Sequence, residues 1–253
     1  SILQMAGWIS PSGVEDVILR KLDHLLAFAQ EEYTIVNTDG WVQKEQAVRY
    51  KLSLAEKLSP DRVVILGDLP EMEESLSKEF YVQKLPPSPY VKARSLSVRR
   101  EIRRNLYLRY FRQALEMEVS MEEVKVKGLR ETRVPREISS LVEKHGYEVL
   151  ASDRDRGRPV LFLNRKPDPD LLKMLRELGI AAHSIDVLER VLVGLFTKKG
   201  GMEGLGIISA IDPEKRKIRV MTPVRRKPKA VVIGRTRLSA SFTQEEKLVL
   251  SPF

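Results

Sequence analysis

Residues 1–91 alternate between short apolar segments and longer segments with helical periodicity, and this alternation constrains the fold more than any other feature. Apolar residues recur at helical spacing over residues 14–30, and a second helix is expected over residues 47–58. Strands are expected at residues 1–9, 34–36 and 62–66. Alternating strands and helices predict right-handed crossovers and a parallel sheet, with ligands beyond the C-terminal ends of its strands.

The pattern changes after Pro86, Pro87 and Pro89. A long helix is expected over residues 97–117, with Val98, Ile102, Leu106 and Tyr110 at intervals of four. Beyond Val119, helices are expected near residues 137–145 and 168–178. Short strands are expected near residues 191–196, 204–210, 218–222 and 230–233, as in a small barrel or sandwich. We therefore predict an α/β fold: a parallel sheet with flanking helices over residues 1–119, then a β-rich C-terminal domain over residues 120–253.

Composition limits the kinds of chemistry that the chain can perform. With 42% apolar and 31% charged residues and no apolar run near the ~20 residues that span a bilayer, we expect a soluble protein without a membrane partner, cytoplasmic or, in a eukaryote, nuclear. The chain has no cysteine, which excludes disulfides and thiolate zinc sites, and its three histidines argue against a histidine metal cluster. Any metal is expected to arrive with a substrate.

The basic residues are unevenly placed. Residues 1–91 hold 9 Lys/Arg against 14 Asp/Glu, and residues 92–253 hold 35 against 21. Within the predicted long helix, Arg99, Arg100, Arg103 and Arg104 fall on neighbouring turns, with Glu101 as the one acid between residues 92 and 112. Guanidinium groups pair with phosphate oxygens, so this helix predicts contact with a polyanion. A merely solvated face is the alternative, but it would usually interleave glutamates.

The segment Asn37-Thr38-Asp39-Gly40-Trp41-Val42 follows the second predicted strand. Polar groups at such a strand end converge on ligands, and a tryptophan there can stack on a nucleobase. The alternative is a tryptophan that packs on the sheet edge, which residue type alone slightly favours.

This segment resembles the signature of the RNA-processing polynucleotide 5′-hydroxyl kinases, a P-loop family with cleavage-factor and nucleolar members. Further similar motifs occur in the same order along the chain: Gly7 with Ser10-Pro11, Arg94-Ser95, Arg99-Arg100-Glu101 with Arg103, Tyr110-Phe111, Leu192 to Leu195, Gly204 to Ile207, and Arg219 to Val224. The resemblance is less clear over residues 120–185.

The resemblance implies transfer of the γ-phosphate of ATP or GTP, with Mg²⁺, to the 5′-hydroxyl of RNA or DNA. Trp41 would then hold the substrate base, and Asn37 and Thr38 would lie near the acceptor. The resemblance implies further substrate contacts at Ser10 and Arg94, and a lid over the transferring phosphoryl group formed by Arg99, Arg100, Arg103 and Arg104. Gly67 and Asp68, at the end of the third predicted strand, are candidate nucleotide contacts.

Two departures from the family pattern affect these expectations. The family continues after the tryptophan with Gly-x-Gly, whereas this chain has Lys44-Glu45-Gln46. No Gly-x-x-x-x-Gly-Lys-Ser/Thr occurs, and residues 201–206 are expected to form a hairpin turn instead. We therefore expect the phosphate loop to lie upstream in a longer protein, and this chain alone to be inactive.

A second basic stretch, residues 213–237, holds ten Lys/Arg against one acid, with its peak at Arg225, Arg226 and Lys227. It predicts a nucleic-acid surface that guides an RNA tail, with solvated hairpin turns as the alternative. The kinase is the leading hypothesis. The alternatives are a non-catalytic RNA-binding subunit of a processing complex, which would also bind partner proteins, and a P-loop protein acting on a small phosphate acceptor.

Overall fold

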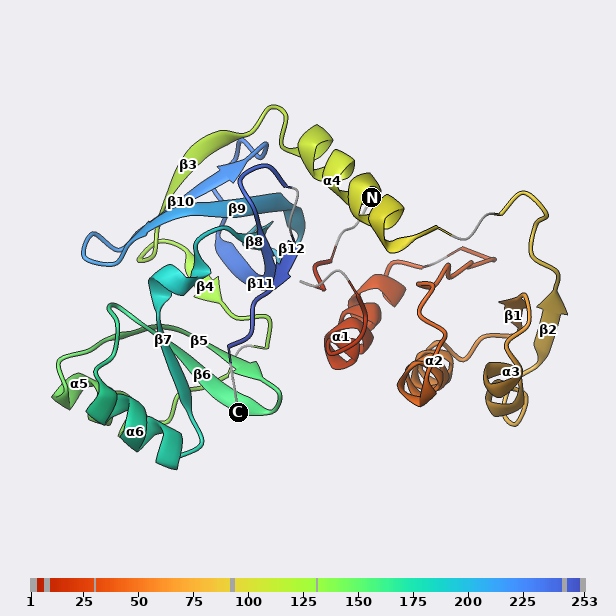
Figure 1. Ribbon diagram of the computed structural model, residues 1–253, viewed down its shortest axis with the longest axis horizontal. Helices are drawn as coiled ribbons and strands as arrows, with labels where there is room; N and C mark the ends of the chain where they lie inside the picture. The colour runs from red at the N-terminus through yellow and green to blue at the C-terminus, as the bar shows by residue number, and fades with distance from the viewer. Residues whose placement is uncertain are drawn as a thin grey trace. The chain divides into compact units, whose positions relative to one another are not determined.

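A computed structural model describes residues 4–6, 10–29, 31–91, 94–130, 132–242 and 245–250. Backbone contacts group the chain into two compact units, residues 10–96 and residues 97–253 with the first nine residues (Figure 1). The long basic helix is grouped with the C-terminal residues. The predicted domains, 1–119 and 120–253, were drawn from composition and stay a prediction.

The unit of residues 10–96 is an α/β arrangement with one parallel strand pair. Its elements are α1 (Glu15–Leu26), α2 (Glu45–Leu58), β1 (Val63–Leu66), α3 (Pro70–Leu76) and β2 (Val82–Leu85). β1 and β2 pair in parallel, with Val63 opposite Val82. Ala55, Ile65, Met72 and Leu76 form the buried centre of this unit. The predicted helices at residues 14–30 and 47–58 and the strand at 62–66 are confirmed, and the sheet is parallel as predicted.

Two predicted strands are not present in the described residues. Thr34 to Val36 has no ladder partner there, and Ile35 is 93% exposed, so this apolar run is irregular. A period-two or apolar pattern cannot supply the neighbouring strand that a ladder needs. Gln4 to Ala6 are not in a strand, and residues 1–3 and 7–9 lie outside the described residues. The sequence reading also missed α3 and β2.

The basic helix, α4 (Leu96–Tyr110), is shorter than predicted, because a strand, β3 (Leu115–Ser120), begins where the helix was expected to continue to Met117. Residues 115–120 alternate between apolar and polar side chains, which suits a strand with one covered face. β3 forms an antiparallel ladder with β10 (Lys217–Thr222), and that partner supplies hydrogen bonds along its length.

A seven-stranded sheet forms most of the C-terminal unit. The order along it is β12-β11-β8-β9-β10-β3, and β4 pairs with β11. The strands not yet named are β4 (Lys125–Lys127), β8 (Val191–Phe196), β9 (Met202–Asp212), β11 (Ala230–Leu238) and β12 (Glu245–Lys247). The four predicted C-terminal strands are confirmed. β8 and β9 form an antiparallel hairpin around residues 197–201, so a hairpin is present as predicted, but residues 202–206, which were expected in its turn, lie in β9.

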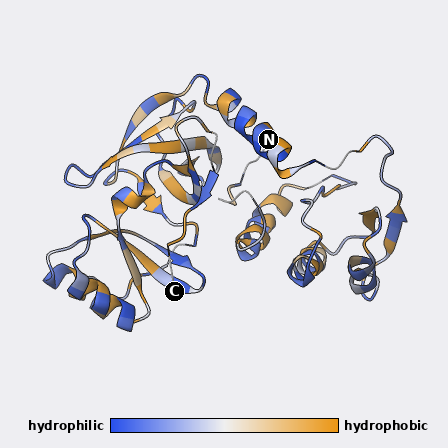
Figure 2. Ribbon diagram, in the orientation of Figure 1, coloured by the Kyte–Doolittle hydropathy of each residue, from blue (hydrophilic) through white to orange (hydrophobic). Residues whose placement is uncertain are grey.

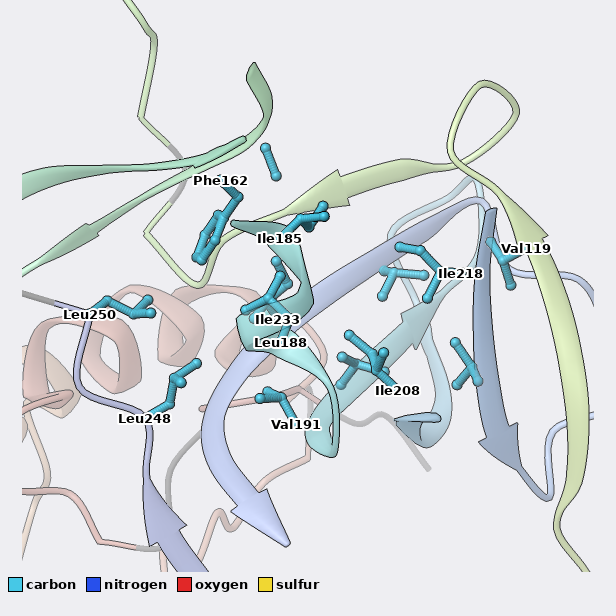
Figure 3. Packing of buried hydrophobic residues seen from close by; sticks show 14 of the residues in the cluster. Val119, Phe162, Ile185, Leu188, Val191, Ile208, Ile218, Ile233, Leu248 and Leu250 are labelled. Atoms are coloured by element: carbon cyan, nitrogen blue, oxygen red, sulfur yellow. The ribbon is translucent and has the colours of Figure 1, made fainter. Parts of the chain in front are cut away.

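A smaller α/β layer packs against this sheet. Its elements are β5 (Val149–Asp155), β6 (Arg158–Leu163), β7 (Ala181–Ser184), α5 (Arg136–Lys144), α6 (Pro169–Glu177) and the 3-10 helix η1 (Ile185–Leu188). Alternate residues of β6 face opposite ways: Leu161 and Leu163 lie in a core with the helices, and Val160 and Phe162 lie in the main core with both sheets (Figure 3). The arrangement is thus layered, as in a sandwich.

These elements confirm the predicted fold class, a parallel strand pair with flanking helices followed by a β-rich region. Within the described ranges, no helix is both long and apolar enough to cross a membrane.

Candidate nucleic-acid interface

Helix α4 carries the predicted lid arginines on an open surface. Figure 2 shows hydrophilic and hydrophobic residues mixed along it, and none of its residues is buried. Arg99 and Arg100 are exposed and have no acidic partner among the residues that the structure describes. Their charges are therefore available to a polyanion.

Arg103 is held by a residue far along the chain. Its Nε donates to both carboxylate oxygens of Glu245 in β12, at 3.0 and 2.9 Å. Glu245 is 10% exposed and Arg103 is 32% exposed, so the pair is partly shielded from water. Because Nε makes this contact, the two terminal amino groups of Arg103 remain for another acceptor. Arg104 differs, since its Nε is buried and has no hydrogen-bond partner within the described part of the chain.

Aromatic side chains attach α4 to the C-terminal strands. Burial, followed by the charge of the hydrogen-bonded Glu245 carboxylate, raises the pKa of Tyr107 to about 12. The Phe111 ring stacks on Phe242 at 5.7 Å and 6°. The Tyr110 hydroxyl accepts a hydrogen bond from the backbone N–H of Leu205 at 2.7 Å. The helix therefore presents its arginines from a fixed position on the C-terminal unit.

The predicted substrate loop is built around Asp39 rather than around free polar groups. One carboxylate oxygen of Asp39 accepts from the backbone N–H of Trp41 at 3.0 Å, and the other accepts from Lys51 Nζ at 3.0 Å. Trp41 is half-buried and stacks on Tyr50, with ring centroids 5.9 Å apart at 28°. Burial, then the charge of Asp39, raises the pKa of Tyr50 to about 12. Trp41 thus packs against Tyr50, and part of its surface remains exposed to solvent.

Lys51 is a site residue that the sequence reading missed. It lies on α2 with its side chain only 8% exposed, and its Nζ also donates to the Asp39 carbonyl at 2.9 Å. A signal was present: Lys51 falls four residues after Ala47 and three before Leu54, both buried, so it places a charge on the apolar face of the helix. A buried lysine requires an acidic or carbonyl partner, which here is Asp39.

Lys44 occupies a backbone conformation that favours glycine. Its φ is +76° and its ψ is 149°, immediately before α2. Lys44 stands in the part of the loop where the resembling family has Gly-x-Gly. A side chain in this region costs on the order of 1–3 kcal/mol.

The remaining predicted contacts are scattered within the unit of residues 10–96. Ser10 is half-buried, and Asn37, Thr38 and Arg94 are exposed. Asp68 is engaged by Lys84, whose Nζ lies 2.8 Å from its carboxylate and 3.0 Å from Glu73. The Lys84 ammonium holds the pKa of Asp68 below its usual value. Gly67, with φ +97°, provides the turn after β1.

The second basic surface lies on the segment between β10 and β11. Arg225, Arg226 and Lys227 are exposed, and Arg225 donates to the backbone carbonyl of Gln113 at 2.8 Å. The surface therefore lies beside the C-terminal end of α4.

The predicted lid and the predicted substrate loop belong to different compact units. That they act on one substrate stays a prediction. The described residues contain no group of three His, Asp or Glu side chains that could hold a metal ion.

These features define a class of protein with an α/β unit that contains a parallel strand pair, followed by an arginine-presenting helix on a β-rich unit. Residues 3–113 match the family model described as the mRNA cleavage and polyadenylation factor CLP1 P-loop. The resemblance to the RNA-processing polynucleotide kinases is thereby confirmed.

Individual relatives agree with this assignment. The polyribonucleotide 5′-hydroxyl-kinase TK1956 of Thermococcus kodakarensis is 26% identical over 200 residues, which are 77% of this chain and 56% of that protein. The polyribonucleotide 5′-hydroxyl-kinase PF0112 of Pyrococcus furiosus is 26% identical over 197 residues, or 76% and 55%. A solved structure of wild-type Clp1p with Pcf11p is similar in fold, with a TM-score of 0.50 and 15% identity over 88% of this chain and 51% of that one. The chain spans about half the length of the curated relatives it matches.

Proposed function

We propose that the protein containing this chain is a polynucleotide 5′-hydroxyl kinase, which transfers the γ-phosphate of ATP or GTP to the 5′-hydroxyl of RNA or DNA. The observation that carries the proposal is the match of residues 3–113 to the CLP1 P-loop family, together with relatives named as polyribonucleotide 5′-hydroxyl-kinases. Those names favour a kinase over a non-catalytic RNA-binding scaffold.

In this proposal the exposed arginines of α4 stabilise the transferring phosphoryl group. Phosphoryl transfer needs positioning and charge stabilisation more than covalent chemistry, so fixed guanidinium groups suit it. Arg99 and Arg100 have no competing acid among the described residues, and the Glu245 contact leaves the terminal amino groups of Arg103 for a phosphate oxygen. Arg104 is half-buried and its Nε is shielded from solvent, so it is less open than Arg99 and Arg100.

In the same proposal, the predicted substrate loop binds the 5′-terminal nucleotide of the acceptor. The face of Trp41 that Tyr50 does not cover would stack on the base of the 5′-terminal nucleotide, a contact worth about 1–3 kcal/mol. Asn37 and Thr38, both exposed, would lie near the acceptor hydroxyl, with Ser10 and Arg94 as further substrate contacts. The triphosphate, with Gly67 and Asp68 as candidate contacts, and Mg²⁺ are proposed from the family alone, since the sequence lacks a Gly-x-x-x-x-Gly-Lys-Ser/Thr loop.

We also propose a cytoplasmic location, or a nuclear one in a eukaryote, and association with RNA-processing proteins. The partner proposal is supported by the solved Clp1p structures, which contain Pcf11p.

The test is 5′-end labelling by the full-length protein. With γ-labelled ATP or GTP and Mg²⁺, a 5′-hydroxyl RNA should be labelled and a 5′-phosphate RNA of the same sequence should not. The double variant Arg99→Ala, Arg100→Ala should lower kcat by about 100-fold or more. The matched variant Arg219→Ala, whose guanidinium faces Glu116 at 3.8 Å, should keep the wild-type kcat. RNA binding without labelling by either triphosphate would overturn the kinase and favour the scaffold.

A further inference from the structure

The ten basic residues between positions 213 and 237 separate into two groups in the structure. Most are already engaged: Lys215 with Asp212, Arg216 with Glu148, Lys217 with Glu118, Arg219 with Glu116, Arg235 with Asp153, and Arg237 with the Val187 carbonyl. The other four, Arg225, Arg226, Lys227 and Lys229, are exposed and have no acidic partner in the described ranges. The basic residues of this stretch that are both exposed and without an acidic partner among the described residues therefore lie in the segment between β10 and β11.

Two residues at the C-terminal end of α4 extend this group. Arg109 and Arg112 are exposed and likewise lack an acidic partner among the described residues. Arg225 donates to the carbonyl of Gln113, the neighbour of Arg112, at 2.8 Å. The end of the helix and the basic segment are thus in direct contact.

Backbone anchors fix both parts to one strand. Leu205 in β9 donates its N–H to the Tyr110 hydroxyl at 2.7 Å, and its carbonyl accepts from Thr222 Oγ1 at 2.7 Å, just before the basic segment. At the other end of the segment, the N–H of Lys229 donates to the Phe196 carbonyl at 2.7 Å. A backbone held in place in this way needs no ordering of its own when a ligand binds to the side chains that it carries.

We propose that the basic edge, defined as Arg109, Arg112, Arg225, Arg226, Lys227 and Lys229, binds the backbone phosphates of a single-stranded polynucleotide downstream of its reacting 5′ end. This proposal rests on the proposed function for its direction: the 5′ end lies at Arg99 and Arg100. Arg109 follows Arg99 by ten residues, or about 15 Å of helix. A substrate must therefore extend several nucleotides beyond its 5′ end to reach the basic edge.

The experiment measures RNA affinity in the absence of a triphosphate, in the full-length protein. Fluorescence anisotropy is recorded against salt concentration for 5′-hydroxyl RNAs of about four and about sixteen nucleotides, the range that single-strand grooves cover. In the double variant Arg226→Ala, Lys227→Ala, the longer RNA should bind about fivefold more weakly per lost contact at 0.1 M salt, and its log–log salt slope should fall by about 1.4. The short RNA should bind as it does to the wild type.

The matched control is Lys217→Ala, Arg219→Ala, which removes the same charge from residues paired with Glu118 and Glu116. It should leave the affinity for both RNAs unchanged. The basic edge is overturned if the wild type does not prefer the longer RNA, if the double variant keeps the wild-type slope, or if the control loses as much affinity as the double variant. Because no phosphoryl transfer is measured, the binding result stands whether or not the 5′-end labelling succeeds.

Discussion

Replacing Glu245 by glutamine should release the Arg103 side chain from its contact with β12. It should lower the stability of the protein and the kinase activity that we propose for it. The substitution keeps the shape of the side chain and removes the charge that faces Arg103 Nε through both oxygens, at 3.0 and 2.9 Å. Tyr107 shares the same carboxylate, so the variant also weakens a second contact between α4 and β12.

The expected loss of stability follows from the burial of the two partners. Breaking a fully buried pair costs about 3–5 kcal/mol, and a hydrogen bond to a charged group contributes about 1.5–3 kcal/mol. Glu245 is 10% exposed but Arg103 is 32% exposed and can regain water, so we expect the lower range, about 1.5–3 kcal/mol. For a unit of this size that corresponds to a fall in Tm of roughly 3–12 °C.

Urea unfolding and thermal melts of the full-length protein would measure this loss, with Glu116→Gln as the matched control. Glu116 faces Arg219 at 3.8 Å and both side chains are more than half exposed, so its variant should stay within about 0.5 kcal/mol of the wild type. A double-mutant cycle of Glu245→Gln with Arg103→Gln should give a coupling energy above about 1 kcal/mol. Additive effects, or a Glu245→Gln variant as stable as the control, would refute the reasoning.

Three further predictions concern the backbone and the tyrosines. Lys44→Gly should stabilise the unit of residues 10–96 by about 1 kcal/mol or more in urea unfolding, because φ is +76° there, whereas Lys44→Ala should not. Gly204→Ala should destabilise by about 1–3 kcal/mol, because a Cβ would lie 2.6 Å from the Tyr110 hydroxyl; unchanged melting would contradict this. The raised pKa of Tyr107, about 12, keeps it protonated when folded, so its contribution to stability is present below pH 10 and lost as pH rises through 12. Tyr107→Phe should therefore lose less unfolding free energy between pH 9 and 12 than the wild type, and parallel curves would exclude the assignment.

The parts of the fold that the sequence predicted are those whose pattern is complete in a local window. The helices at α1 and α2, and the strands β8 to β11, have a periodicity visible over their own residues. The wrong predictions lie where a pairing strand that is distant in the sequence determines the secondary structure. The helix is predicted to extend to Met117 although its apolar positions at intervals of four end at Tyr110, and residues 115–117 instead pair with β10, which is distant in the sequence. Thr34 to Val36 has a strand's composition and no ladder partner in the described residues.

The predicted substrate loop shows the same limit on a smaller scale. The sequence identified Asp39 and Trp41 as neighbours at a strand end, which is sufficient to suggest a ligand site. It could not show that Lys51 and the Trp41 backbone N–H both engage the Asp39 carboxylate. The consequence is that Asp39 organises the loop, and the groups left to contact a substrate are the open surface of Trp41 and the exposed Asn37 and Thr38.

The four arginines proposed as a lid are equivalent in the sequence pattern, and the Glu245 contact of Arg103 makes them unequal in the structure. Glu245 lies 142 residues from Arg103, so no local pattern connects the two. Because its charge is largely balanced by Glu245, Arg103→Ala should change the salt dependence of RNA affinity less than Arg100→Ala does, where a free charge is lost. The Arg103 guanidinium is nevertheless held more firmly than that of Arg100, so Arg103→Ala should lower kcat more than it lowers RNA affinity. Affinity measured against salt, beside kcat and KM, separates these effects: equal slope changes for the two variants would mean that the Glu245 pair does not neutralise Arg103 in solution.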